Sequence, residues 1–193
     1  MSFLRDYHVR AYLIAAAWFA ADQMTKAWAS GTLETTPTII VVPKVMAFQL
    51  GHNTGTMFSL FDSWSEPWRS ILLIVFPVLA IFGATLILWK TQRHEIFARF
   101  GLALILGGAT GNIFDRILHG YVVDFIVWYA GWEPASGWLI DRFGTNRWPT
   151  FNVADVGIFC GIALLGIQLL QPTRLTNDIE PVEKETRHAP ESD

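Results

Sequence analysis

Hydrophobic residues along the chain fall into four long runs separated by polar segments. The clearest run, 70–89, reads SILLIVFPVLAIFGATLILW, twenty residues without a charge, which is the length that crosses a bilayer as a helix. The runs at 11–28, 97–114 and 152–171 follow the same pattern with a few polar positions. We therefore predict an all-α membrane protein with four transmembrane helices near 11–28, 70–89, 97–116 and 152–171.

The polar segments set the limits of this domain. Residues 1–171 are expected to form a single integral-membrane domain, and the polar residues 172–193 a cytoplasmic tail. Arg5 and Arg10 before the first run resemble the start of a cleaved signal peptide. However, helical character continues through DQMTK and three further runs follow, which favours an uncleaved first helix.

Composition supports the membrane assignment and excludes other classes. Hydrophobic residues make up 52% of the chain and charged residues 16%, which is too apolar for an ordinary soluble domain. The net charge of −3 and the lack of a basic face argue against a nucleic-acid partner. The single cysteine, Cys160, cannot form an internal disulfide, and the five histidines are scattered. A metal site is therefore not expected.

Charge and tryptophan positions predict the orientation. Eight Lys and Arg residues flank the helix ends on the side of both termini, and six lie on the other side, spread over two long loops. By the positive-inside rule, both termini are expected in the cytoplasm. Seven tryptophans fall in or beside the outer loops, where indole rings prefer the headgroup layer: Trp28, Trp64, Trp68, Trp128, Trp132, Trp138 and Trp148.

Three acidic residues are predicted at one level near the outer ends of the helices. Counted outward from the inner cationic ends, Asp22, Asp115 and Asp155 lie roughly 18, 24 and 28 Å along their helices, in a hydrocarbon core about 30 Å thick. Asp124, a little past the third helix, can fold back to the same level. Ionisable groups at that depth usually face the bundle interior or a wet cavity.

Two pairs among these residues also have an ordinary structural interpretation. Asp22 and Lys26 are spaced i, i+4, which predicts a structural ion pair on one helix face. Asn152 and Asp155 have the spacing of a helix N-cap and its N3 carboxylate. Either pair alone would indicate structure rather than catalysis.

The combination of polar residues points to chemistry. Asn112, Asp115 and Arg116 share one helix face at i, i+3 and i+4, although Asp115 and Arg116 alone would also fit a local ion pair. Asn53 lies in the first outer loop, where Gly55 permits a tight turn. These amides and acids can converge only at the outer mouth of the bundle.

The sequence lacks the common motifs of other hydrolases, so its acidic residues are the remaining candidates for catalysis. The sequence contains neither an HExxH zinc motif nor a GxSxG serine motif. Two adjacent carboxyl groups cannot both ionise easily, so they share a proton. One then accepts a proton from water while the other donates to a carbonyl, which is peptide hydrolysis of the aspartic type. A small transporter or proton channel, and a purely structural membrane subunit, are the alternatives.

Four sequence boxes occur in order along the chain. They are DQMTK at 22–26, NTGTMF at 53–58, GNIFDRILHGYVVDF at 111–125 and FNVAD at 151–155. These boxes lie on or beside all four predicted helices and both outer loops. Together they resemble the conserved boxes of the lipoprotein signal peptidase family, the bacterial signal peptidases II.

This resemblance implies an inner-membrane aspartic endopeptidase with its active site at the outer, periplasmic face. It implies removal of the signal peptide from diacylglyceryl-modified prolipoproteins, with the cut just before the lipidated Cys and without a cofactor or metal. It further implies a protein of the phospholipid bilayer that is inhibited by globomycin, and we expect a monomer. The implied catalytic pair is Asp124 and Asp155. The implied supporting residues are Asn53, Gly55, Asn112, Asp115, Arg116 and Asn152.

The fold that the resemblance implies has four helices, a small β-sheet cradle on the outer face and a short interfacial helix in the second outer loop. The β-branched segment TIIVVPKVMAFQL at 38–50 predicts cradle strands. This chain departs from the family pattern at Thr56 and Met57, where two alanines are usual. The stretch between Asp124 and Asp155 is also longer than the family pattern, around EPASGWLIDRFGTNRW.

The positions of the two implied catalytic acids suggest which of them holds the shared proton. Asp155 lies in the first turn of the fourth helix, where the helix dipole favours an anion. Asp124 lies outside a helix end, between two apolar residues. We therefore predict that Asp124 is the member that is more often protonated.

Overall fold

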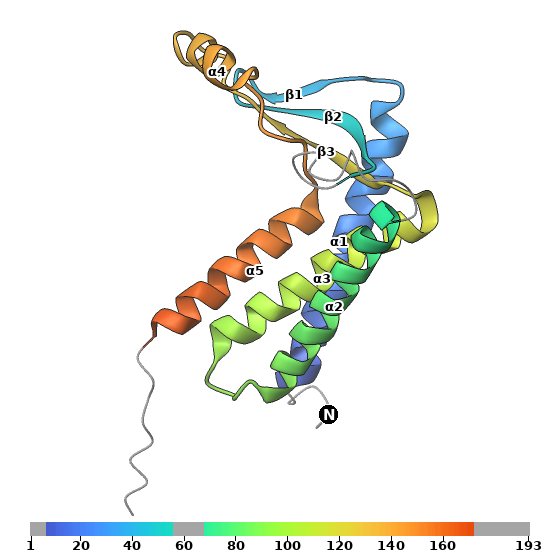
Figure 1. Cartoon of the computed structure of the whole chain (residues 1–193), viewed down its shortest axis with the longest axis vertical. Coiled ribbons are helices and arrows are strands. Elements are labelled where there is room, and N and C mark those ends of the chain that lie inside the picture. The colour runs from blue at the N-terminus through green and yellow to red at the C-terminus, as the bar shows by residue number, and fades with distance from the viewer. Residues whose placement is uncertain (1–6, 56–67, 172–193) are drawn as a thin grey trace, which may run out of the picture.

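The computed structural model of the chain describes residues 7–55 and 68–171 (Figure 1). Long helices form the larger part of it, a small sheet lies at one end of the helices, and a short helix lies beyond the sheet. Predictions that concern Thr56, Met57, Trp64 and the tail 172–193 fall outside the described residues. The elements are α1 (Tyr7–Leu33), β1 (Ile39–Val42), β2 (Met46–Asn53), α2 (Trp68–Lys90), α3 (Ile96–His119), β3 (Val122–Trp128), α4 (Ala135–Phe143) and α5 (Val153–Leu170).

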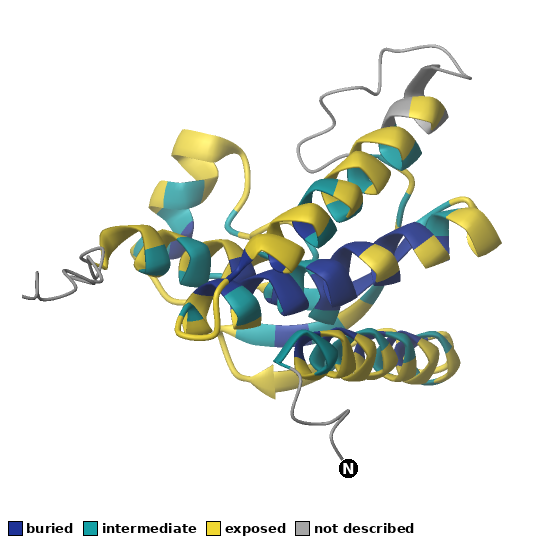
Figure 2. Ribbon diagram, turned by 90° about the horizontal axis from the view of Figure 1, so that it is seen from below, coloured by how far each residue is buried: buried dark blue, intermediate teal, exposed yellow. Residues whose placement is uncertain are grey.

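Helix α3 lies in the middle of the bundle. Gly101, Gly107 and Gly108 are among its buried residues, and small residues at such positions let neighbouring helices approach closely. A Cβ at Gly101 would lie 2.6 Å from the carbonyl oxygen of Gly161 on α5, so these two backbones are in direct contact. Figure 2 shows buried positions concentrated on one central helix and exposed positions on the helices around it.

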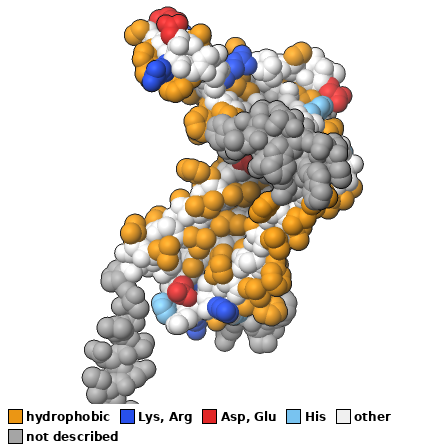
Figure 3. Space-filling view, in the orientation of Figure 1, with side chains coloured by type: hydrophobic (Ala, Val, Ile, Leu, Met, Phe, Trp, Pro, Cys, Tyr) orange, Lys and Arg blue, Asp and Glu red, His pale blue; other side chains and the backbone are white. Residues whose placement is uncertain are grey.

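Three of the described helices are long and apolar enough to cross a membrane. They are Leu73–Lys90 within α2, the whole of α3, and α5. Helix α1 has 27 residues but is not among the three, since Asp22, Gln23 and Lys26 lower its mean hydropathy. Hydrophobic side chains cover much of the visible face of the bundle, whereas most visible charged side chains lie over the cradle and α4 or at the opposite end of the bundle (Figure 3).

The sheet, called the cradle below, has the order β1-β2-β3 with both pairs antiparallel. Strands β1 and β2 come from the segment 38–50 and extend to Asn53, so the cradle strands predicted there are confirmed. Strand β3 is additional to the predicted elements, and it carries Asp124 opposite Gly51 of β2. A run such as VVDFIVW is typical of a strand that is buried on both faces.

The cradle is fixed to the bundle through its apolar face. Phe125 of β3 is buried and forms a cluster with Ala29 and Leu33 in the last turns of α1. The rings of Trp28, Phe48 and Phe125 pack against one another edge to face, with centroids 5.4 to 6.2 Å apart. Because side chains alternate along a strand, burial of Phe125 directs Asp124 to the other face of β3.

The second loop contains the expected short helix, α4. It ends at Phe143 and is capped by Gly144, which adopts φ of 75° and whose N–H donates to the carbonyl oxygen of Ile140. The chain then returns along β3: Trp148 N–H donates to Trp128 O at 2.8 Å, and Phe151 N–H donates to Ile126 O at 3.1 Å. The indoles described in this part of the chain are between 46% and 61% exposed: Trp128, Trp132, Trp138 and Trp148.

Candidate active site

The polar residues of all four sequence boxes meet where the cradle joins the bundle. Helix α1 contributes Asp22 and Lys26, and the end of α3 contributes Asn112 and Asp115. Strand β2 ends at Asn53, β3 carries Asp124, and Asn152 and Asp155 begin α5. The side chains of Asp22, Lys26, Asp115, Asp124 and Asn152 are at most 3% exposed. Buried charged and polar side chains require hydrogen-bond or ion-pair partners, and each of these five side chains has such partners.

Asn152 holds both implied catalytic acids. It is the N-cap of α5: its Oδ1 accepts from Asp155 N–H at 3.0 Å, and its own N–H donates to Asp155 Oδ2 at 3.2 Å. The predicted N-cap is thus confirmed, with a full capping box. The Nδ2 of the same residue donates to Asp124 Oδ1 at 2.7 Å. One amide therefore connects the start of α5 to the middle of β3.

Asn112 forms a second connection behind the two acids. Its Nδ2 donates to Asp155 Oδ1 at 2.8 Å, while its Oδ1 accepts from Asn152 Nδ2 at 3.1 Å and from Lys26 Nζ at 2.9 Å. An ammonium group can only donate hydrogen bonds. Lys26 therefore determines which end of the Asn112 amide faces Asp155.

Lys26 forms two buried ion pairs. Its Nζ lies 2.8 Å from Asp22 Oδ2, so the predicted i, i+4 pair is present, and 2.9 Å from Asp115 Oδ2. The local interpretation of Asp115 and Arg116 is wrong in this respect, because Asp115 pairs with Lys26 on another helix. Arg116 Nη1 instead donates to the Asn112 carbonyl oxygen at 3.5 Å.

The two carboxylates bound to Lys26 also anchor the segments that carry the implied catalytic acids. Asp22 Oδ1 accepts from Ala154 N–H at 2.8 Å, in the first turn of α5. Asp115 Oδ2 accepts from Val123 N–H at 3.1 Å, next to Asp124 on β3. The pair predicted as structural is therefore part of the support of the site.

Gln23 is a site residue that the motif analysis does not single out. Its Nε2 donates to Asp22 Oδ2 at 3.1 Å, to Asp115 Oδ1 at 3.0 Å and to the Gly111 carbonyl oxygen at 3.3 Å. Its only signal in the sequence is its place beside Asp22 in DQMTK. Since a helix places i and i+1 on different faces, periodicity alone assigns Gln23 no role.

Asn53 binds the second oxygen of the Asp124 carboxyl group. Its Nδ2 donates to Asp124 Oδ2 at 2.9 Å, and its Oδ1 accepts from Gly55 N–H at 3.0 Å. The turn predicted at Gly55 therefore orients the Asn53 amide. With Asn152 on Oδ1 and Asn53 on Oδ2, both oxygens of Asp124 are bonded.

The surroundings of Asp124 favour the protonated form of its carboxyl group. Burial and the neighbouring Asp155 carboxylate raise its pKa from 3.8 to about 7, against the opposing effects of Asn53, Asn152 and Lys26. Asp155 is more accessible, being only half-buried. Among the described residues, no group of three or more His, Cys, Asp or Glu side chains is placed to hold a metal ion.

Gly111→Ala is expected to destabilise the site. A Cβ at Gly111 would collide with Asp22 Oδ2, a buried atom that is paired with Lys26. We expect a loss of roughly 1–3 kcal/mol of unfolding free energy, measured as a lower thermal midpoint in detergent. Gly83→Ala on α2 is the matched control, because a Cβ there meets open space. Equal thermal midpoints for Gly111→Ala and Gly83→Ala would contradict the close contact between Gly111 and the Asp22 carboxylate.

Comparison with known proteins identifies the family. The family model of signal peptidase (SPase) II matches residues 14–171, which include every site residue named above. The chain belongs to the signal peptidase II family. It is therefore a peptidase with apolar helices typical of a bacterial membrane protein, and membership disfavours the transporter and structural-subunit alternatives.

Relatives of this signal peptidase II chain match most of its length. It is 35% identical over 169 residues to a lipoprotein signal peptidase of Solibacter usitatus, covering 88% of this chain and 95% of the relative. It is 39% identical over 159 residues to one from Xylella fastidiosa, covering 80% and 84%. Its fold is similar to that of a bacterial membrane enzyme solved by the in meso method at 1.9 Å, with a TM-score of 0.67, 24% identity and coverage of 85% and 94%.

Proposed function

We propose that this chain is an aspartic endopeptidase whose catalytic pair is Asp124 and Asp155. The observation that carries the proposal is the binding of both carboxyl groups by Asn152, with the pKa of Asp124 raised to about 7. A pair with one proton supplies a general acid and a general base at the same time. The supporting shell consists of Asn53, Gly55, Asn112, Asp115, Arg116 and Asn152, joined by Asp22, Gln23 and Lys26.

In the proposed reaction, the Asp155 carboxylate accepts a proton from water while the water oxygen bonds to the scissile carbonyl carbon. Asp124 gives its proton to the carbonyl oxygen, so a tetrahedral diol forms. Asp155 then returns its proton to the amide nitrogen as the C–N bond breaks, and the diol returns one proton to Asp124. The products are a carboxyl group and an amine, and the pair regains its starting protonation. Arg116 is proposed to hold a substrate carbonyl group.

The proposed substrates are prolipoproteins that carry a diacylglyceryl group on cysteine, cut just before that cysteine. The curated relatives are lipoprotein signal peptidases, and the proposed site lies where the apolar helices end and the tryptophan-rich cradle begins. A lipid anchored in the outer leaflet would reach this level by lateral entry between helices. We propose globomycin as an inhibitor of this site and a monomer as the working form.

The proposed topology has four spans, both termini in the cytoplasm and the site at the outer face. Helix α1 is the fourth span: its 27 residues extend about 40 Å. Its polar residues Asp22 and Lys26 are buried toward α3 rather than exposed to lipid, which is how a membrane helix accommodates such groups.

The direct test is cleavage of a diacylglyceryl-modified prolipoprotein by the purified full-length chain, followed as a shift on a gel. We expect cleavage that globomycin blocks and that a metal chelator leaves unchanged. Mass spectrometry of the product reports whether the lipidated cysteine is its first residue. An inactive, folded wild-type protein would contradict the proposed function.

Cleavage is expected to decline above about pH 7, because Asp124 then loses the proton that it must donate. The value of kcat/KM should fall about tenfold per pH unit on this alkaline limb. Asn53→Ala removes a hydrogen bond that stabilises the Asp124 anion, so the limb should move to higher pH. Thr35→Ala, at an exposed position after α1, is the control and should leave the limb in place. If Asn53→Ala leaves the alkaline limb at the same pH, ionisation of Asp124 does not cause the decline in kcat/KM.

A further inference from the structure

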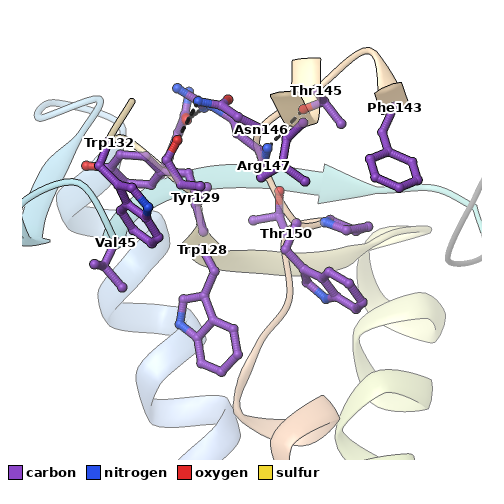
Figure 4. Close-up of a pocket in the computed structure, with 15 residues that line it drawn as sticks. Val45, Trp128, Tyr129, Trp132, Phe143, Thr145, Asn146, Arg147 and Thr150 are labelled. Atoms are coloured by element: carbon purple, nitrogen blue, oxygen red, sulfur yellow. Dashed lines mark hydrogen bonds between the residues drawn. The ribbon is translucent and has the colours of Figure 1, made fainter. Parts of the chain in front are cut away.

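A cavity of about 930 Å³ lies between the cradle and α4. Its walls are β2, β3, α4 and the returning segment 145–150. Figure 4 shows Trp128 pointing away from β3, with Trp132 and Val45 to one side and Phe143 to the other. The size is at the upper end of the range for ligand sites in proteins. The residues that line it take no part in the proposed reaction.

Two walls of the cavity lead back to the candidate site along the chain. Strand β3 carries Asp124 and, four residues later, Trp128, a separation of about 13 Å along a strand. Alternation places these two side chains on the same face of β3. The opposite wall ends at Thr150, two residues before Asn152. A chain lying extended from the acids along β3 therefore enters the cavity after three or four residues.

The lining is aromatic with one cationic group. Trp128, Trp132 and Trp148 are 53%, 46% and 58% exposed, so much of each indole surface is open to an occupant. Arg147 Nη1 donates to Gln49 Oε1 at 2.9 Å, which orients a guanidinium that has five N–H groups in total. Such a site favours an apolar or aromatic side chain with a carboxylate beside it.

We propose that this cavity binds the first residues of the mature lipoprotein and selects an apolar or aromatic side chain, with an acidic neighbour, three to five residues after the cut. This inference rests on the proposed peptidase function. The apolar part of a signal peptide belongs with the membrane helices, whereas Leu139 and Phe143 of α4 line the cavity, and α4 lies beyond the cradle from the bundle (Figure 1). The part of the substrate that follows the cut is therefore the part that would extend toward α4 and the cavity.

The test compares three diacylglyceryl prolipoproteins that differ only at positions three to five after the cut. One carries Phe and Asp there, one carries Phe and Lys, and one carries Gly and Ser. We expect wild type to cleave the Phe–Asp substrate with kcat/KM about tenfold above the Gly–Ser substrate, and to prefer Asp over Lys. Trp128→Ala should lose the preference for Phe, and Arg147→Gln the preference for Asp over Lys.

Ratios between substrates separate recognition from folding, because the fraction of active enzyme cancels within one preparation. Trp138→Ala is the matched control: it removes an indole of α4 that is 61% exposed and does not line the cavity, so both preferences should persist. Equal cleavage of all three substrates by wild type, or an unchanged preference in Trp128→Ala, overturns the subsite alone. A preference that follows the phospholipid composition of the bicelles instead assigns the cavity to a lipid and also overturns it. Failure of wild type on every substrate overturns both the subsite and the peptidase function.

Discussion

Replacing either Asp124 or Asp155 by Asn is expected to abolish cleavage of a diacylglyceryl prolipoprotein. Each variant removes one of the two groups that carry protons in the proposed reaction, which lowers kcat/KM by roughly 10²- to 10⁴-fold. The double variant should be little worse than either single one, since members of one catalytic unit are not additive. The measurement is kcat/KM from gel shifts at matched enzyme concentrations.

Asn is not a neutral replacement at these positions, so folding must be measured beside activity. Both oxygens of Asp124 accept hydrogen bonds, from Asn152 and Asn53, and an amide can keep only one of these as an acceptor. We expect each variant to lose about 1–3 kcal/mol of stability from the unsatisfied donor. Asp141→Asn, on an exposed position of α4, is the control for the change of charge and should keep full activity. A folded variant of Asp124 or Asp155 that still cleaves would remove that residue from the mechanism.

Replacing Lys26 by Met is expected to have the largest effect on stability. The change removes the ion pairs to Asp22 and Asp115 and the bond to Asn112. Both carboxylates are almost fully buried, at 0% and 2% exposure, and would be left without their cation. Losing one partner of a buried pair costs about 3–5 kcal/mol. Thermal unfolding in detergent and the folded fraction on gel filtration measure this loss.

Lys90→Met is the control for Lys26, because Lys90 lies exposed in the last turn of α2 and should change stability by less than about 0.5 kcal/mol. Adding Asp115→Asn to Lys26→Met should recover part of the loss, which a double-mutant cycle reports as coupling between the two residues. If the two lysine variants unfold alike, the buried pairs do not stabilise the protein.

Local sequence patterns account for much of the candidate site. Periodicity places Asn112, Asp115 and Arg116 on one face of α3, and the N-cap spacing of Asn152 and Asp155 appears in the structure as a capping box. Both features depend on neighbours within one helical turn. The i, i+4 pair of Asp22 and Lys26 is present for the same reason.

Contacts between distant segments could not be predicted in this way. Asp22 binds Ala154 N–H across 132 residues, Lys26 binds Asn112 across 86, and Asn53 binds Asp124 across 71. These contacts depend on how closely the helices approach and on the register of the cradle, which no local pattern specifies.

Local sequence patterns were sufficient to predict the long apolar helices, the cradle strands at 38–50 and the residue types that converge at one end of the bundle. Hydrophobic length and helical periodicity are local properties, so they can be read from neighbouring residues. Three features become visible only in the folded chain: Asp124 lies on a strand, Asp115 pairs with Lys26 rather than Arg116, and Gln23 joins the network. The physical reason is that buried charges take whichever partner the packing of α1, α3 and α5 brings within hydrogen-bond distance, and this packing depends on the whole chain.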